Sequence, residues 1–98
     1  MKIQLLYFEG CPHVDAARAA VRQAIALDAV EVVVEEIDVD APSAPAWARR
    51  WGSPTILVDG QDVAGQAPSG SSCCRLYAGG APSVEAVRAS IASASRRP

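Results

Sequence analysis

Three cysteines and one histidine are the side chains of this chain best suited to covalent chemistry. Cys11 lies in the stretch Gly10-Cys11-Pro12-His13, whereas Cys73 and Cys74 are adjacent to each other far downstream. A thiol acts as a nucleophile or as a ligand for a soft metal only after it has lost its proton. The chemistry therefore depends on whether Cys11 favours the thiolate, and on whether the other two cysteines can reach it.

The residues on either side of Cys11 predict a junction between a strand and a helix. Residues 2–9 are apolar at both parities, which is typical of a strand covered on both faces, and residues 14–27 have helical spacing with Pro12 suited to the first turn. A cysteine at a helix N-terminus faces unpaired N–H groups that favour the thiolate, and a protonated His13 favours it further. We therefore predict that Cys11 is a catalytic nucleophile assisted by His13. The alternatives are a small buried cysteine beside a turn and a solvent-facing histidine with no role.

The rest of the chain alternates short apolar runs with helical or turn-forming segments. In order, we expect a strand at 30–39, a short helix within 40–51, a strand at 55–58, a strand at 61–64, an irregular segment at 65–82, a helix capped by Ser83 and a frayed tail at 95–98. A helical link makes the first two strands parallel, and Asp59-Gly60 predicts a tight hairpin between the last two. We therefore expect one α/β domain over residues 1–98, with the order β-α-β-α-β-β-α and a four-stranded mixed sheet flanked by three main helices.

This order resembles the thioredoxin fold in its small, glutaredoxin-like form. Two stretches carry the resemblance, "GCPHV" at the end of the first strand and "GSPTILVDG" at residues 52–60. In the second stretch, Ser53-Pro54-Thr55 resembles the cis-proline loop that precedes the third strand in that superfamily. Small bacterial thioredoxin-like proteins also carry a late segment similar to Cys74-Arg75-Leu76-Tyr77. The resemblance implies a redox-active Cys11 followed by Pro12, and a substrate-binding loop at Ser53, Pro54 and Thr55.

The chain departs from the family at the fourth position of its active-site tetrapeptide. Val14 stands where the thiol-oxidising branch has a second cysteine, so an exchange within the tetrapeptide cannot be completed. If the strands pair as the fold requires, the segment after Gly65 starts at the same end of the sheet as Cys11. Cys73 or Cys74 could then fold back and resolve a mixed disulfide on Cys11. The two adjacent cysteines are a poor pair with each other, because their Cα atoms are only ~3.8 Å apart.

Other interpretations of the late cysteines stay open. The three thiols could hold a soft metal such as Zn²⁺, Cu⁺ or Hg²⁺, although the paired spacing of a structural zinc site is absent. The two late cysteines could also simply pack a loop, which would leave an interaction module without chemistry. Arg75 could bind a substrate carboxylate or the thiolate, or be a solvated surface residue.

The composition limits the classes of partner. A net charge of -2 argues against nucleic acid and anionic membranes as partners, and no segment is long enough to span a membrane. Met1 to Phe8 is too short and too polar for a signal peptide. Three cysteines are too few for a disulfide scaffold, so we expect a cytoplasmic protein with reduced thiols. The favoured function is a thiol-disulfide oxidoreductase without an organic cofactor, whose partners are protein or low-molecular-weight thiols and disulfides such as glutathione.

Overall fold

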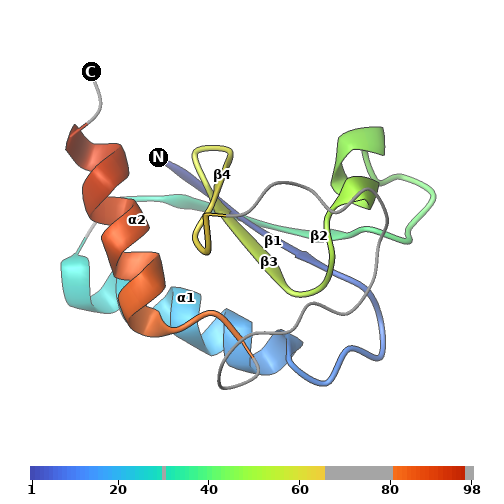
Figure 1. Cartoon of the computed structure of the whole chain (residues 1–98), viewed down its shortest axis with the longest axis horizontal. Coiled ribbons are helices and arrows are strands. Elements are labelled where there is room, and N and C mark those ends of the chain that lie inside the picture. The colour runs from blue at the N-terminus through green and yellow to red at the C-terminus, as the bar shows by residue number, and fades with distance from the viewer. Residues whose placement is uncertain (30, 66–80, 97–98) are drawn as a thin grey trace.

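A mixed four-stranded sheet in the order β2-β1-β3-β4 runs through the centre of this computed structural model (Figure 1). The structure describes residues 1–29, 31–65 and 81–96. The strands are β1 (Lys2–Tyr7), β2 (Val33–Asp38), β3 (Thr55–Val58) and β4 (Gln61–Asp62). β1 pairs in parallel with β2 and antiparallel with β3, and β4 pairs antiparallel with β3. The predicted α/β class and four-stranded mixed sheet are therefore confirmed.

The helices differ from the prediction in number and in where they begin. They are α1 (Val14–Asp28), the short 3₁₀ helix η1 (Ala46–Arg50) and α2 (Val84–Arg96). The prediction of three main helices is wrong for the described residues, because the second helix is only a 3₁₀ helix of five residues. Pro12 lies in a turn ahead of α1 rather than in its first turn. The tail expected to fray over residues 95–98 is helical at residues 95 and 96, because α2 continues to Arg96, and residues 97–98 lie outside the described residues.

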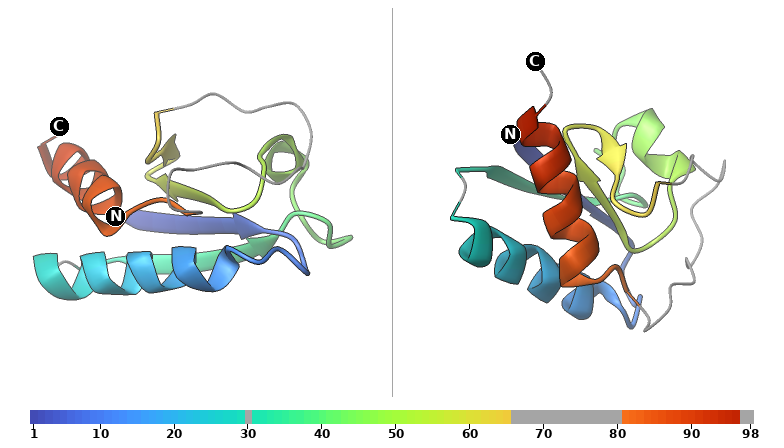
Figure 2. Two further views of the ribbon diagram at one scale, coloured as in Figure 1. Left: turned by 60° about the horizontal axis from the view of Figure 1, so that its bottom comes forward. Right: turned by 60° about the vertical axis from the view of Figure 1, so that its left-hand side comes forward.

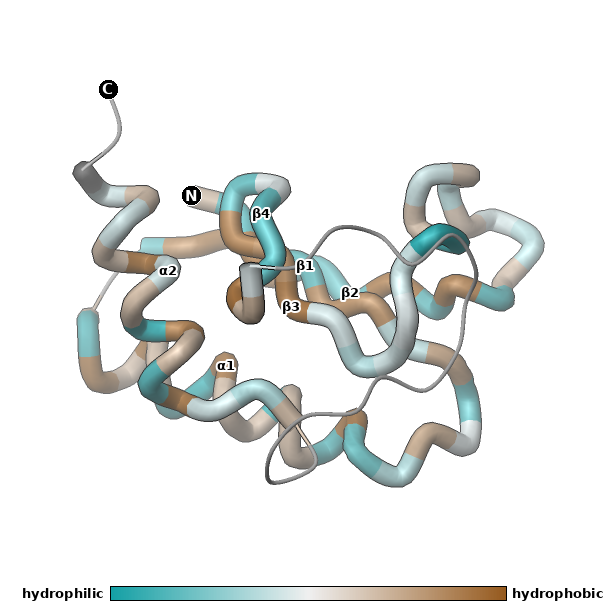
Figure 3. The backbone as a smooth tube through the Cα atoms, in the orientation of Figure 1, coloured by the Kyte–Doolittle hydropathy of each residue, from teal (hydrophilic) through white to brown (hydrophobic). Residues whose placement is uncertain are grey.

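The two faces of the sheet carry cores of different size. α1 and α2 pack side by side on one face, and η1 lies on the other (Figure 2). Ile3 and Leu5 of β1 join the larger core beneath the two α-helices, whereas Leu6 joins the smaller core with Trp51. Figure 3 shows the hydrophobic segments concentrated on β3 and alternating along α2. The apolar residues at both parities of β1 therefore reflect burial on both faces, as predicted.

The ends of the elements fix the geometry that matters for a site. Asp59 (φ 49°) and Gly60 (φ 85°) both have positive φ, so the predicted tight hairpin is confirmed. β4 has two residues rather than the expected four, and β2 begins at Val33 rather than at residue 30, which lies outside the described residues. The predicted cap of the last helix is confirmed, because the Ala86 N–H donates to the Ser83 hydroxyl at 3.1 Å. None of the helices in the described ranges is both long and apolar enough to cross a membrane.

Candidate functional site

A tight turn between β1 and α1 carries Cys11. The Cys11 N–H donates to the Phe8 carbonyl at 3.3 Å, and Gly10 has φ 85°. A positive φ at the third residue is the pattern of a type II turn, which favours glycine. A Cβ at Gly10 would meet no atom within 4 Å, so the space beside the turn is open. Gly10 is therefore needed for the backbone conformation, and it also leaves room next to Cys11.

Cys11 carries a free thiol and is half-buried. It lines an open pocket of about 240 Å³ between the end of β1 and the start of α1. Its neighbours around the pocket are Tyr7, Phe8, Glu9, Gly10, Val14, Asp15 and Arg18. The thiol also packs against the larger core, so it is anchored on one side and reachable on the other.

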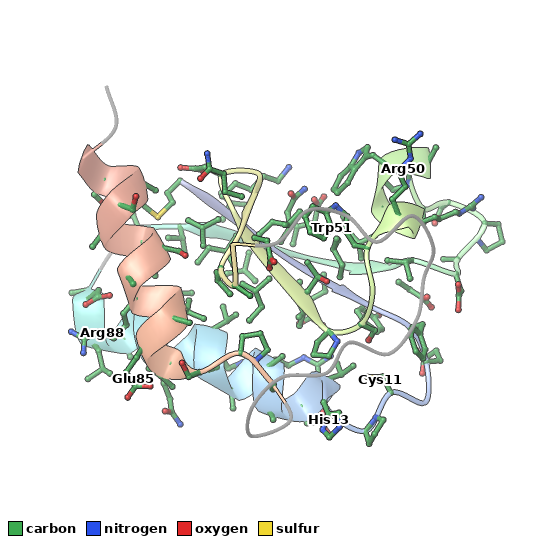
Figure 4. The ribbon with its side chains drawn as sticks, viewed as in Figure 1. Cys11, His13, Arg50, Trp51, Glu85 and Arg88 are labelled. Carbon is green, nitrogen blue, oxygen red and sulfur yellow. The ribbon has the colours of Figure 1, made fainter. Side chains whose placement is uncertain are left out.

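His13 and the helix terminus lie immediately after the cysteine. Figure 4 shows Cys11 and His13 together at the start of α1. His13 is the N-cap residue of α1, and its side chain makes no capping hydrogen bond. The first backbone hydrogen bond of the helix is made by the Ala17 N–H, which donates to the His13 carbonyl at 3.1 Å. The N–H groups of the first turn are therefore not satisfied by a capping side chain, and they remain available to a negative charge.

Arg18 is held by two acidic partners at the edge of the pocket. Its Nε lies 3.1 Å from both carboxylate oxygens of Glu36, and its Nη2 lies 2.7 Å from Glu36 Oε1. Its Nη1 donates to Asp15 Oδ1 at 2.8 Å. The hydrogen bond from Arg18 lowers the pKa of Glu36 below its usual range. This cluster ties α1 to β2 directly beside Cys11.

Tyr7 contributes a protonated phenol to the same pocket. It ends β1 and packs against the larger core, so it is half-buried. Burial raises the pKa of Tyr7, and the carboxylates of Asp38, Glu9 and Glu36 raise it further. The phenol therefore stays neutral and able to donate a hydrogen bond around neutral pH.

The Ser53-Pro54-Thr55 loop lies at the same end of the sheet as Cys11. The register pairs Leu6 with Thr55, and the Phe8 N–H donates to Ser53 Oγ at 3.4 Å. The Ser53-Pro54 peptide bond is cis, as the sequence resemblance implied. All three side chains of the loop are buried, and the Thr55 hydroxyl donates to the Gly52 carbonyl at 2.7 Å. The three residues are buried as whole residues, so the backbone of the loop is buried together with its side chains.

The remaining predicted site residues, Cys73, Cys74 and Arg75, lie outside the described residues. The structure therefore leaves their position relative to Cys11 untested. Within the part of the chain that is described, no group of three or more His, Cys, Asp or Glu side chains could hold a metal ion.

Sequence reasoning missed four residues with polar or charged groups that line the pocket, namely Tyr7, Glu9, Asp15 and Arg18. A signal was present for Arg18, because Val14 and Arg18 are four residues apart and share one face of a helix. Tyr7 was assigned to the strand core and Glu9 to its end.

Comparison with protein-family models, with curated proteins and with solved structures found no match for this chain.

Proposed function

We propose that this protein exchanges thiols and disulfides, with Cys11 as its nucleophile and with a thioredoxin-like fold. The observation that carries the proposal is the free, half-buried Cys11 thiol in an open pocket between β1 and α1. The strand pairings, which are parallel for β1 and β2 and antiparallel for the others, are those that the resemblance implies. The cis bond before Pro54 at the same end of the sheet supports the same interpretation.

The proposed reaction begins with attack by the Cys11 thiolate on one sulfur of a substrate disulfide. A bond forms between Cys11 Sγ and that sulfur while the substrate S–S bond breaks, and the second sulfur leaves as a thiolate that takes up a proton from solvent. A second thiolate then attacks Cys11 Sγ and releases the first substrate sulfur. The substrate disulfide is reduced to two thiols, and two other thiols are oxidised to a disulfide. These two reaction steps require no group on the protein other than cysteine thiols.

His13 and the start of α1 are proposed to stabilise the Cys11 thiolate. Cys11 lies two residues before the His13 N-cap, so it faces the end of the helix rather than sitting within its first turn. The effect of a helix terminus falls off within about one turn, and a protonated imidazole nearby adds a full charge. His13 is half-buried beside Cys11 and therefore contributes through its charge when it is protonated.

Cys74, or Cys73, is proposed as the second thiol. Cys74 is seven residues before Ala81 in the sequence, and Ala81 packs against the same core as Cys11. Figures 1 and 2 show residues 81–83 passing beside the start of α1. Seven residues span at most roughly 25 Å, so the chain length allows either cysteine to reach the pocket. Glutathione or a protein thiol would then reduce the resulting disulfide.

The nucleophile is tested by the rate at which Cys11 is alkylated at neutral pH. A variant with Cys73→Ser and Cys74→Ser leaves Cys11 as the one cysteine, so iodoacetamide reports on it alone. We expect Cys11 to react faster than free cysteine, because the thiolate is the nucleophile, and His13→Asn to slow the reaction. A rate no faster than that of free cysteine would contradict the proposal.

The resolving thiol is tested separately, by mass spectrometry after mild oxidation of the full chain. We expect a peptide in which Cys11 is joined to Cys73 or Cys74. Intermolecular dimers or glutathione adducts alone would show that the resolving role is wrong, while leaving Cys11 as a nucleophile. Stoichiometric Zn²⁺, Cu⁺ or Hg²⁺ that protects all three cysteines from alkylation would instead favour a soft-metal protein.

A further inference from the structure

The charged side chains around the Cys11 pocket are mostly acidic. Of the described residues that line it, Glu9 and Asp15 are carboxylates, and Arg18 is the one basic residue. Glu9 is exposed, and the Asp15 side chain is 95% exposed. Both carboxylates are therefore in water at the mouth of the pocket, where an approaching molecule meets them first.

Arg18 does not offer a free positive charge to a substrate. Each of its three guanidinium nitrogens donates to a carboxylate, at 2.7 to 3.1 Å. Its side chain is only 28% exposed, and moving it toward a ligand would leave Glu36 without its partner. Two carboxylates, Asp15 and Glu36, bind this guanidinium, and Glu9 adds a third carboxylate to the pocket, so the carboxylates outnumber the one guanidinium there.

From this arrangement we propose that the Cys11 site selects positively charged disulfides, such as a peptide disulfide flanked by lysine or arginine, over negatively charged ones. The inference rests on the proposed function, because it names the substrate class of the same cysteine. Glutathione disulfide, which has more carboxylates than ammonium groups, is then a poor substrate for the first step. The step itself is the exchange already described, in which Cys11 Sγ joins one substrate sulfur and the other leaves as a thiol.

The size of the preference follows from Coulomb's law at a water-exposed surface. One unit charge about 7 Å from another in water changes the local concentration roughly threefold. A cationic and an anionic disulfide differ in the sign of that effect, so we expect rates that differ about tenfold at low ionic strength. At ~1 M salt the screening length falls to about 3 Å, and the ratio should fall below about twofold.

The experiment measures the formation of a mixed disulfide at Cys11 in the full chain carrying Cys73→Ser and Cys74→Ser. The probes are cystamine, which is cationic, hydroxyethyl disulfide, which is neutral, and dithiodiglycolate, which is anionic. Each rate is determined by mass spectrometry and divided by the rate of the same probe with 2-mercaptoethanol, which removes the differences between leaving groups. We expect the order cystamine, hydroxyethyl disulfide, dithiodiglycolate, with about tenfold between the first and the last.

Charge variants identify which residues cause the preference. Glu9→Gln combined with Asp15→Asn removes both pocket carboxylates, and we expect it to reduce the ratio to about threefold or less. Glu31→Gln is the matched control, because Glu31 is exposed and precedes β2 at the opposite end of the sheet, where Val33 pairs with Lys2. The control should leave the ratio unchanged.

The outcomes separate the inference from the proposed function. If dithiodiglycolate reacts as fast as cystamine, or if Glu31→Gln lowers the ratio as much as the pocket variant does, the charge preference is overturned while Cys11 stays a nucleophile. If none of the three disulfides forms an adduct with Cys11, the proposed function is wrong, and the inference falls with it.

Discussion

Two glycine-containing turns lie at opposite ends of the sheet, and they differ in how firmly they are held. The Asp59-Gly60 turn joins β3 to β4, and Asp59 makes two hydrogen bonds with Lys2. The Asp59 N–H donates to the Lys2 carbonyl, and the Asp59 carboxylate accepts from the Lys2 N–H, both at 2.8 Å. The turn at Gly10 is closed by one longer hydrogen bond of 3.3 Å between the Cys11 N–H and the Phe8 carbonyl. Both glycines have φ 85°.

The difference indicates a division of roles between the two ends. The Asp59-Gly60 turn fixes the register of the sheet, because both of its central residues have the positive φ that a twisted hairpin requires. The Gly10 turn leads the chain away from the sheet and leaves Cys11 at an open pocket. We therefore expect changes at the first turn to affect stability, and changes at the second to affect thiol chemistry.

The largest expected effect is on chemistry alone. Cys11→Ser should slow exchange with hydroxyethyl disulfide at least about a hundredfold, because a serine hydroxyl is not ionised near neutral pH. The side chain is half-buried, so the free energy of unfolding should change by less than about 1 kcal/mol. A single-turnover assay and urea unfolding measure the two quantities. If exchange persisted in Cys11→Ser, another residue would be the nucleophile. The control is the double variant Cys73→Ser with Cys74→Ser, which should still form the mixed disulfide at Cys11.

The next effect is on stability alone. Asp59→Ala removes the acceptor for the Lys2 N–H and places alanine at φ 49°, so we expect a loss of about 2 kcal/mol in the free energy of unfolding. Asp59→Asn keeps an acceptor and tolerates this conformation, so it should lose much less. Urea unfolding measures the loss, and Cys11 alkylation should be unchanged in both variants. A slower alkylation in Asp59→Ala would show that the two ends are coupled.

A matched pair of glycine substitutions compares the turns directly. Gly10→Ala and Gly60→Ala each place a Cβ in open space but at φ 85°, so each should cost about 1 kcal/mol of stability through backbone strain. Only Gly10→Ala should change the alkylation rate of Cys11, because it shifts the turn that holds the thiol. Equal effects of both substitutions on that rate would remove the distinction between the turns.

The smallest effect concerns acid stability at the Cys11 end. Arg18 lowers the pKa of Glu36 in the folded chain, so this pair stabilises the fold above the ordinary glutamate pKa of about 4.3 and loses its contribution as the pH falls through the lower folded value. We expect Glu36→Gln to cost less than about 1 kcal/mol at neutral pH, because the pair is partly exposed and screened by salt. Urea unfolding between pH 7 and 3 should show the two proteins converging at low pH. A constant difference over that range would mean that packing, and not charge, is responsible.

Much of the fold followed from local sequence signals. The apolar residues at both odd and even positions of the first strand, such as Ile3, Leu5 and Leu6, predicted a strand buried on both faces. Asp59-Gly60 predicted the hairpin. Such signals work because strand periodicity and turn conformations depend on a few neighbouring residues. The second helix was predicted less well. Pro45 is extended at its N-cap and Trp51 is anchored in the smaller core, so only a short 3₁₀ helix forms between them.

The sequence by itself determined that Cys11 lies at the junction of a strand and a helix, because the change from strand to helical periodicity occurs on either side of it. Only the tertiary structure decided what surrounds the thiol. Glu36 lies opposite Leu5 through the parallel register of β1 and β2, and from there it binds Arg18 of α1. That contact joins α1 to β2, which are separate in sequence, so no local pattern encodes it. Glu9 and Asp15, the carboxylates that line the Cys11 pocket, are close to the cysteine in the sequence. Strand pairing adds Glu36, which binds Arg18 and so keeps its positive charge away from the pocket.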